Sequence, residues 1–152
     1  MKWVKRILIG IVVIAAIIVG WWYYATDSAS KLTEYDFGTD KIRSINAVIG
    51  ETRKVTGVST GVSASTSGSS QYKQYDYETA SMGKDLTTYW TTYLQSNGWT
   101  PIKDFSLNAS KGEMQIAKES ADSGKILIML VEFEQSKYTI KITKGEGTLT
   151  RK

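Results

Sequence analysis

The sequence predicts an α+β fold: an N-terminal single transmembrane helix, followed by a small domain with a twisted antiparallel sheet packed against one main amphipathic helix. Three observations lead to this prediction. Residues 7–24 form an uncharged apolar run, one later segment repeats apolar residues with a helical period, and several others alternate apolar and polar residues as strands do. Short connections between successive strands favour antiparallel pairing.

The apolar run 7–24 has the length of a membrane span. At about 1.5 Å per helical residue it covers roughly 27 Å, close to the ~30 Å hydrocarbon core of a bilayer. It lacks the polar face that a soluble core helix shows to solvent. We therefore expect a transmembrane anchor over 7–24, with the lipid bilayer as its partner.

The flanks of this run predict its orientation. Lys2, Lys5 and Arg6 precede it, and positive charge stays on the cytoplasmic side, so 1–6 is expected to be a basic cytoplasmic N-terminus. Lys5 and Arg6 are long enough to reach back to the headgroups. Aromatic residues suited to the outer interface end the run: Trp21, Trp22, Tyr23 and Tyr24. We expect a single-pass protein of the cell membrane with its C-terminal domain outside.

A cleaved signal peptide is the alternative to an anchor. The apolar run is longer than the roughly 7–15 residues usual in such signals, and bulky aromatic residues follow where a cleavage site needs small ones. The absence of cysteine excludes lipoprotein processing. The sequence favours an uncleaved anchor, and cleavage stays open as an alternative.

The charge distribution limits the possible partners. The chain has 19 Lys and Arg, 15 Asp and Glu, and a formal net charge of +4. Three of the 19 basic residues precede the span, which leaves 16 against 15 acidic residues beyond it. A nearly neutral domain lacks the clustered basic surface of a nucleic-acid binder, so we expect no nucleic acid partner.

The chain contains no histidine and no cysteine. It therefore lacks the commonest acid–base residue, the commonest metal ligand, any thiol nucleophile and any disulfide. The phosphate-binding spacing GxxxxGK[ST] and the nucleophile spacing GxSxG do not occur. We expect no cofactor, no metal site and no catalytic residue. Outward domains without disulfides are common in bacteria, which favours a bacterial envelope protein.

The segment 25–38 is polar and shows no clear period. We expect it to be a flexible stalk between the anchor and an extracytoplasmic domain over 39–143. A helical continuation of the anchor, as in pilin-like proteins, is the alternative, but Gly38 would interrupt it.

The first predicted element of the domain is a short helix over 41–49. Thr39 and Asp40 offer N-cap oxygens, and Gly50 offers a C-terminal stop. The isoleucines of this segment are β-branched and would also suit a strand.

Residues 55–70 are rich in Gly, Ser and Thr and have two interpretations. They form either a flexible loop or, as we favour, a strand that turns at its end and pairs with the next segment of the chain. In that next segment, also expected to be a strand, Tyr75 and Tyr77 lie on one side. Asp76 and Glu78 lie on the other, solvated side.

The clearest element of the domain is an amphipathic helix that begins after Ser81 and ends at Gly98. Its apolar residues recur at helical spacing: Leu86, Tyr89, Trp90, Tyr93 and Leu94. The opposite face, with Lys84 and Asp85, is expected in solvent. We expect the aromatic stripe to be the main core contact with the sheet, so Trp90→Ala should strongly destabilise the domain.

Four strand-like segments come after this helix: 99–107, 113–118, 125–135 and 138–143. Pro101 places the first of them at a sheet edge, because proline cannot donate to a ladder. The segment 125–135 is the most apolar and is expected at the centre of the sheet. The polar tail 144–152 is expected to fray.

The sequence favours a non-enzymatic binding or interaction domain, because it contains a clear membrane anchor but no catalytic motif. Its partner would be an envelope protein or a cell-surface component. One alternative is a cell-wall hydrolase that uses acidic residues: Asp76, Glu78, Glu132 and Glu134. Another is a structural component that self-associates through the small residues Ala16 and Gly20 of the anchor. The oligomeric state stays open.

Overall fold

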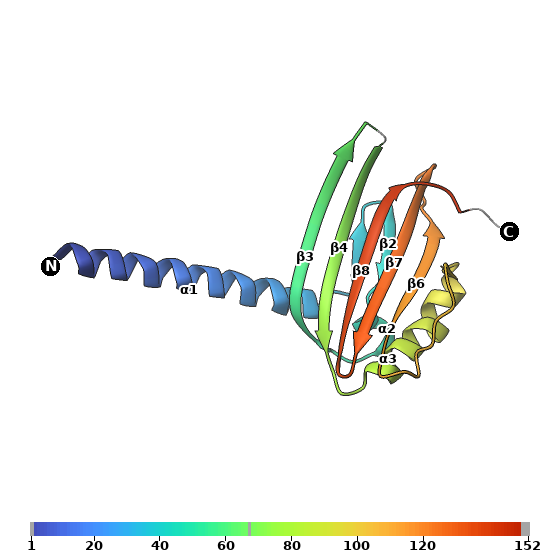
Figure 1. Cartoon of the computed structure of the whole chain (residues 1–152), viewed down its shortest axis with the longest axis horizontal. Coiled ribbons are helices and arrows are strands. Elements are labelled where there is room, and N and C mark those ends of the chain that lie inside the picture. The colour runs from blue at the N-terminus through green and yellow to red at the C-terminus, as the bar shows by residue number, and fades with distance from the viewer. Residues whose placement is uncertain (1, 67, 150–152) are drawn as a thin grey trace.

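The computed structural model describes residues 2–66 and 68–149. In this part of the chain the fold is α+β: the apolar helix α1 (Lys2–Ser30) projects from a domain built on a six-stranded antiparallel sheet (Figure 1). The other elements are β1 (Glu34–Phe37), β2 (Asp40–Arg43), α2 (Ile45–Ile49), β3 (Lys54–Ser65), β4 (Gly68–Glu78), α3 (Met82–Thr88), the π-helix η1 (Tyr89–Leu94), the 3₁₀-helix η2 (Gln95–Asn97), β5 (Thr100–Pro101), β6 (Lys111–Glu119), β7 (Lys125–Glu134) and β8 (Lys137–Glu146).

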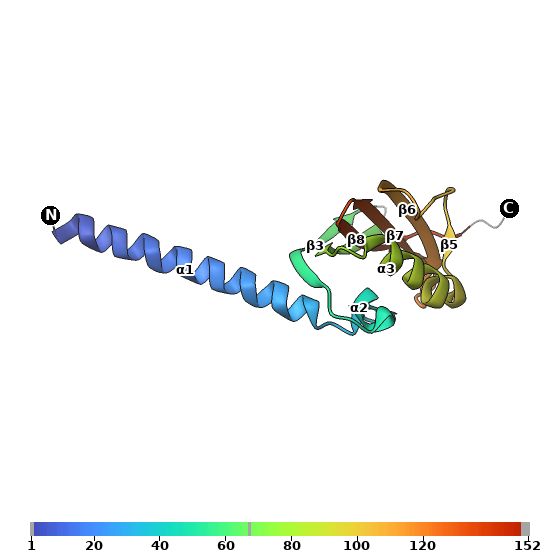
Figure 2. The same cartoon turned by 90° about the horizontal axis from the view of Figure 1, so that it is seen from below.

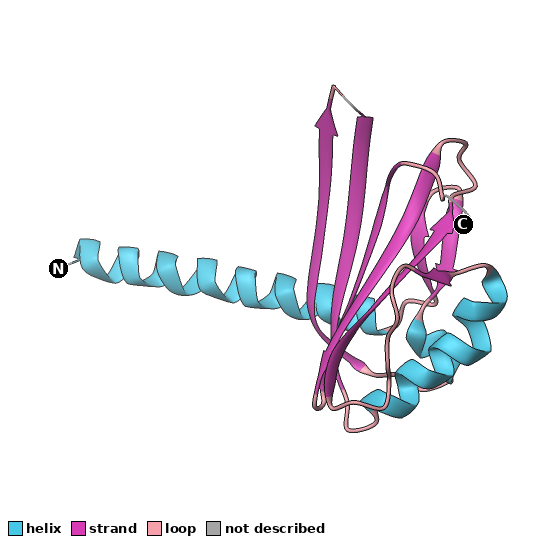
Figure 3. Ribbon diagram, turned by 45° about the vertical axis from the view of Figure 1, so that its right-hand side comes forward, coloured by secondary structure: helices cyan, strands magenta, loops and turns pink. Residues whose placement is uncertain are grey.

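The large sheet has the strand order β3-β4-β8-β7-β6-β5, and its neighbouring strands are antiparallel (Figure 3). The predicted antiparallel sheet is thereby confirmed. β7 lies in its interior, and β5, which carries Pro101, lies at an edge. The strand interpretation of 55–70 is also confirmed, because β3 and β4 pair as a hairpin. The remaining strands, β1 and β2, form a separate hairpin.

Alternating side chains place one face of the sheet in the core. Along β7 and β8 the core-facing residues are buried: Leu127, Met129, Val131, Phe133, Tyr138, Ile140 and Ile142. Leu86 of α3 and Tyr89 and Leu94 of η1 belong to the same buried cluster. The helices therefore cover this face of the sheet, as Figure 2 shows.

The main helix is not a regular α-helix along its whole length. It begins after Ser81 and ends at Gly98, as expected, but α3 passes into the π-helix η1. The wider π turn changes which side chains face the sheet. Trp90 and Tyr93 are only partly buried, and the Trp90 ring packs edge-on against Phe105 with 5.2 Å between centroids. Trp90 is therefore a peripheral contact of the core, not its main one.

Asp85, expected on the solvent face of this helix, is buried. Its carboxylate accepts hydrogen bonds from Nε and Nη2 of Arg53 at 2.8 and 3.1 Å. The hydrogen bond to Asp85 raises the pKa of the Arg53 guanidinium. A paired charge tolerates burial that a lone charge would not, so the ion pair explains the inward position of Asp85.

The prediction of a flexible stalk over 25–38 is wrong. α1 continues to Ser30, and β1 begins soon after it. The hydroxyl groups of Thr26 and Ser30 donate to main-chain carbonyls of the preceding turn, which satisfies these polar residues within a helix. On β1, Tyr35 and Phe37 alternate into the core.

The helix predicted over 41–49 is wrong in its first half. β2 pairs with β1 there, and Ile42 is buried as a strand residue. α2 begins only after Ser44, whose Oγ accepts a hydrogen bond from the amide of Ala47 at 3.2 Å. Gly50 ends the helix in the left-handed region, as predicted.

The frayed tail expected over 144–152 is wrong for its first residues, because β8 continues through Lys144. This lysine is 4% exposed, and its ammonium lies 2.9 Å from a carboxylate oxygen of Asp40 and 2.5 Å from one of Asp122. The contacts tie the end of β8 to β2 and to the turn between β6 and β7. Residues 150–152 lie outside the described part of the chain.

Candidate functional site

The second face of the sheet carries mostly polar and small side chains, with two aliphatic ones on β7, and they point away from α3. We call it the open face, and it comprises Gly57, Ser59, Gly61, Tyr72, Gln74, Asp76, Glu113, Gln115, Ile128, Leu130, Glu132, Thr139, Lys141 and Thr143. Among the described elements no helix covers this face (Figure 2). Side chains of the four interior strands β4, β8, β7 and β6 are presented together on this face.

One part of the open face is a tyrosine ring lying over small residues. A Cβ atom at Gly61 would stand 2.3 Å from Cε1 of Tyr72, so glycine at this position makes room for the ring. The Tyr72 hydroxyl is 3.3 Å from Oγ of Ser59. The ammonium of Lys141 lies 4.8 Å from the centroid of the same ring, a cation–π contact.

The other part is an acidic row that runs across four strands. Register places Asp76, Thr139, Glu132 and Glu113 side by side on β4, β8, β7 and β6. The Thr139 hydroxyl donates to Oδ1 of Asp76 at 2.8 Å. Among the described residues, Glu132 has neither an ion-pair nor a hydrogen-bond partner, and its side chain is exposed.

Glu113 differs from Glu132 because it is neutralised locally. Its carboxylate accepts from the ammonium of Lys103 and from the amide of Gln115 at 3.2 Å. The hydrogen bond from Lys103 is the main cause that lowers the pKa of Glu113. Glu113 is therefore ionised, and its carboxylate is already bound by Lys103 and Gln115. Glu132 is left as the carboxylate of the row without a partner among the described residues.

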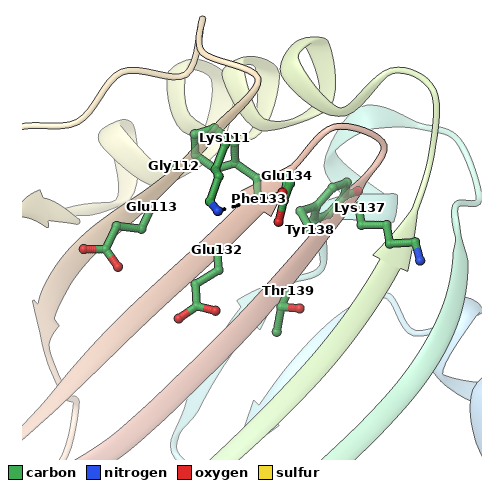
Figure 4. Close-up of a pocket in the computed structure, with 9 residues that line it drawn as sticks. All are labelled: Lys111, Gly112, Glu113, Glu132, Phe133, Glu134, Lys137, Tyr138 and Thr139. Atoms are coloured by element: carbon green, nitrogen blue, oxygen red, sulfur yellow. Dashed lines mark ion pairs between the residues drawn. The ribbon is translucent and has the colours of Figure 1, made fainter.

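A second row of charges lies beside the acidic row. Register aligns Glu78, Lys137, Glu134 and Lys111, whose charges alternate across the strands. Lys111 and Glu134 are 3.8 Å apart. A pocket of about 470 Å³ is lined by three members of each row (Figure 4): Thr139, Glu132 and Glu113 of the first, and Lys137, Glu134 and Lys111 of the second. We call this end of the open face the acidic end.

The four acids singled out by sequence lie together at the acidic end: Asp76, Glu78, Glu132 and Glu134. Alternation along each strand predicted that Asp76 and Glu78 face solvent. Sequence reasoning missed Thr139 and Glu113, whose positions beside these acids depend on strand register. The only signal available for them was the alternation of Thr139 with Tyr138 and Ile140.

The acidic end offers hydrogen-bond acceptors, and the pKa of its Glu113 is lowered. A two-carboxylate hydrolase requires one carboxylic acid that stays protonated near neutral pH. Glu113 is shifted in the opposite direction, and Glu132 is in contact with solvent. Within the described residues, no group of three or more His, Cys, Asp or Glu side chains could hold a metal ion. Carboxylate and hydroxyl oxygens remain available to accept from cationic or hydrogen-bond-donating groups.

Tyrosines gather on the opposite, buried face of the sheet. The hydroxyl groups of Tyr35 and Tyr77 are 2.6 Å apart, and the ring of Tyr77 stacks on Tyr138 at 5.1 Å. Burial raises the pKa of each of these three phenols. They are neutral and enclosed, so they stabilise the core and do not form part of a solvent-accessible site.

α1 carries the remaining residues singled out by sequence. It is the one helix of the described part that is long and apolar enough, by length and composition, to cross a membrane. Exposed side chains of this helix include Arg6, Trp21, Trp22, Tyr23 and Tyr24, whereas the side chain of Lys5 lies outside the described part. Ala16 and Gly20 are exposed on the helix, and space around Gly20 is open. Self-association through these two residues stays a prediction.

The chain was compared with protein-family models, curated proteins and solved structures, and none of them matches it. Its function is therefore inferred from α1, the open face and the acidic end.

Proposed function

We propose that the chain is a single-pass membrane protein of a bacterial envelope, and that its C-terminal domain lies outside the cell and binds another envelope protein or a cell-surface component without catalysis. The basic residues before α1's apolar run and the aromatic residues at its end support the orientation. The near-neutral charge of the domain supports a partner other than nucleic acid.

The open face is the observation that carries the binding proposal. The solvated face of an antiparallel sheet usually carries polar side chains, and the open face also presents the Tyr72 ring, hydroxyl groups and the free carboxylate of Glu132. Glu132 is exposed and has no hydrogen-bond or ion-pair partner within the described part of the chain, so its carboxylate oxygens can accept from a cationic or donor group of a partner. Tyr72 adds a rigid aromatic contact with little entropy to lose.

Crosslinking from a single cysteine on intact cells tests this function, because the natural chain has none. A photoreactive maleimide on Gln115→Cys, in the open face, should give a discrete adduct with one partner. The matched control is Asn108→Cys, exposed on the segment between β5 and β6. The adduct should be lost when Glu132→Lys is added, since charge reversal repels the cationic group. Equal adducts from both positions, or none from Gln115→Cys, would contradict the proposal.

The hydrolase is the second candidate, favoured by the gathering of acids from separate strands at the acidic end. Its test is a chain with Asp76→Asn, Glu78→Gln, Glu132→Gln and Glu134→Gln. Loss of a measurable wall-degrading activity in this variant, with unchanged folding by circular dichroism, would favour the hydrolase. No activity in the natural chain, or activity unchanged by the four substitutions, would eliminate it.

A further inference from the structure

We infer that the free edge of β3 is a second membrane contact, which rests against the lipid headgroups of the outer leaflet that α1 crosses. The inference depends on the proposed function, since it requires α1 to span the bilayer. It adds a fixed orientation of the domain, with the strands lying along the membrane plane and the β3 edge towards the lipid.

The junction between α1 and the domain is held by hydrogen bonds. The amide of Val55, at the start of β3, donates to Oγ of Ser30 at 2.9 Å. The Asn46 side chain donates to the carbonyl of Ser30 and accepts from the amide of Arg53, at 3.0 and 3.1 Å. Arg53 is itself held by Asp85. These contacts join α1, α2, α3 and β3 without a flexible linker.

The direction of β3 relative to α1 is set by this junction. Figures 1 and 3 show the strands running across the axis of α1, with β3 as the strand nearest to the side from which α1 emerges. The free edge of β3 therefore faces back along α1. With α1 across a bilayer, this edge faces the membrane.

The distance along α1 places the edge at headgroup level. If the apolar run up to Tyr24 fills the hydrocarbon core, the next six residues, up to Ser30, rise about 9 Å at ~1.5 Å each. Headgroups occupy roughly 5–8 Å on each side of the core. Ser30 accepts a hydrogen bond from Val55, near the start of β3. The strand therefore begins at the outer boundary of the headgroup layer.

The composition of β3 fits this location. No charged residue occurs over 55–70, in a chain of which 22% of residues are charged. Sheet edges that face water are usually protected by lysine, proline or a very short strand, since unpaired N–H and C=O groups otherwise recruit other strands. The opposite edge has such protection, because β5 is two residues long and contains Pro101. β3 is 12 residues long and has neither lysine nor proline after Lys54.

Beyond the start of β3, where α1 packs against the strand and Ser30 accepts from the Val55 amide, a lipid surface explains why the edge lacks protection. Headgroup phosphates accept from the exposed N–H groups and interfacial water donates to the exposed C=O groups, and a strand without charge after Lys54 loses no ion hydration there. Val62, which is 82% exposed, and the partly exposed Val58 add apolar contact. Two copies in one membrane would both turn this edge towards the lipid, so edge-to-edge pairing between copies is geometrically blocked.

Fluorescence quenching in vesicles tests the inference with the full chain. The cysteine-free sequence allows an environment-sensitive label at one introduced cysteine, in phosphatidylcholine vesicles that contain lipids with a nitroxide on the headgroup or deep in the acyl chain. The variants are Val62→Cys on β3, Asn108→Cys as the matched exposed control and Ile14→Cys inside α1. The headgroup nitroxide should quench the label at 62 about twice as strongly as the label at 108, since only the former lies next to the headgroup layer. High salt should not change this difference, because β3 carries no charged residue after Lys54.

The three positions separate the inference from the function on which it rests. Quenching at 14 by the deep nitroxide, with equal headgroup quenching at 62 and 108, overturns the β3 contact and leaves the anchor in place. No quenching at 14 by the deep nitroxide overturns the anchor itself. Oxidative formation of a Val62→Cys dimer in the vesicles, without headgroup quenching at 62, assigns the edge to a second copy and also overturns the inference.

Discussion

At the scale of single residues, the buried charges of the domain are paired. Lys144 lies between Asp40 and Asp122, and its ammonium is also 3.1 Å from Oγ1 of Thr39. Asp40 accepts further hydrogen bonds from the amide of Ala121 and from a serine hydroxyl. The lysine thus stands where three segments meet, and its charge offsets two carboxylates that would otherwise repel each other.

Replacement of this lysine should strongly destabilise the domain. Lys144→Met keeps the length of the side chain but leaves the Asp40 carboxylate buried without its cation, and we expect the free energy of unfolding to fall by about 3–5 kcal/mol. Urea denaturation followed by tryptophan fluorescence measures the loss. Lys111→Met is the control, because its partner Glu134 and Lys111 itself are 62% and 74% exposed. The control should lose no more than ~1 kcal/mol, and equal losses in the two variants would refute the assignment.

The same cluster predicts how the cost of this substitution changes with pH. Burial alone would raise the pKa of Asp40, but the Ala121 amide, the Ser120 hydroxyl and Lys144 together lower it. A hydrogen bond from Lys144 lowers the pKa of Asp122. A lowered folded-state pKa gives stability that is present above the unfolded value of about 4 and is lost as pH falls through the folded pKa. The difference between the natural chain and Lys144→Met should therefore shrink in urea titrations below about pH 4.

At the scale of elements, period-two alternation predicted most of the sheet. From Leu127 in β7 and from Tyr138 in β8, every second side chain is buried, as expected for strands with one face in the core. The hairpin of β1 and β2 was missed because each strand has four residues, too few for a pattern, and the turn at Gly38 was interpreted as a break. The π-helix was missed because a change in hydrogen-bond ladder leaves no mark in the spacing of apolar residues.

The candidate site could be predicted only in part for a related reason. Alternation shows which face of its own strand Asp76 or Glu132 occupies. It does not show that Thr139 stands between them, because that depends on the register of strands more than 50 residues apart in the chain, set by packing across the core. Likewise, the sequence does not show that Lys103 pairs with Glu113 and not with the neighbouring Glu132.

The junction between α1 and the domain should loosen when Asn46 is replaced. Asn46→Ala removes the donor to Ser30 and both contacts with the main chain of Arg53. We expect amide hydrogen exchange in the last turn of α1 to accelerate about tenfold, since leaving buried partners unsatisfied costs roughly 1–3 kcal/mol. Mass spectrometry of peptides from this turn measures the rate. Asn108→Ala, an exposed position, should leave the rate unchanged, and an unchanged rate in Asn46→Ala would show that the junction does not depend on this side chain.

At the scale of the whole molecule, α1 and the domain act as one body. A flexible stalk would let the domain sample many orientations above a membrane, whereas the helix that continues to Ser30 and the contacts at Val55 fix one. If α1 spans an envelope membrane, as proposed, the open face stands perpendicular to the membrane plane, where the proposed envelope partner would have access to it. The function proposed for the open face therefore depends on which side of the membrane the domain occupies.

That side is predicted by the charges that flank α1. A membrane-impermeant maleimide applied to intact cells should label Asn108→Cys, whereas Val4→Cys should react only after lysis, because positive charge near a span remains in the cytoplasm. Replacing Lys2, Lys5 and Arg6 with glutamine should leave part of the Asn108→Cys population unlabelled, since this change removes the charge bias. The control replaces Lys103, Lys111 and Lys118 with glutamine, which removes the same charge far from the span and should leave labelling complete. Labelling of Asn108→Cys only after lysis would place the domain in the cytoplasm and exclude an envelope partner for the open face.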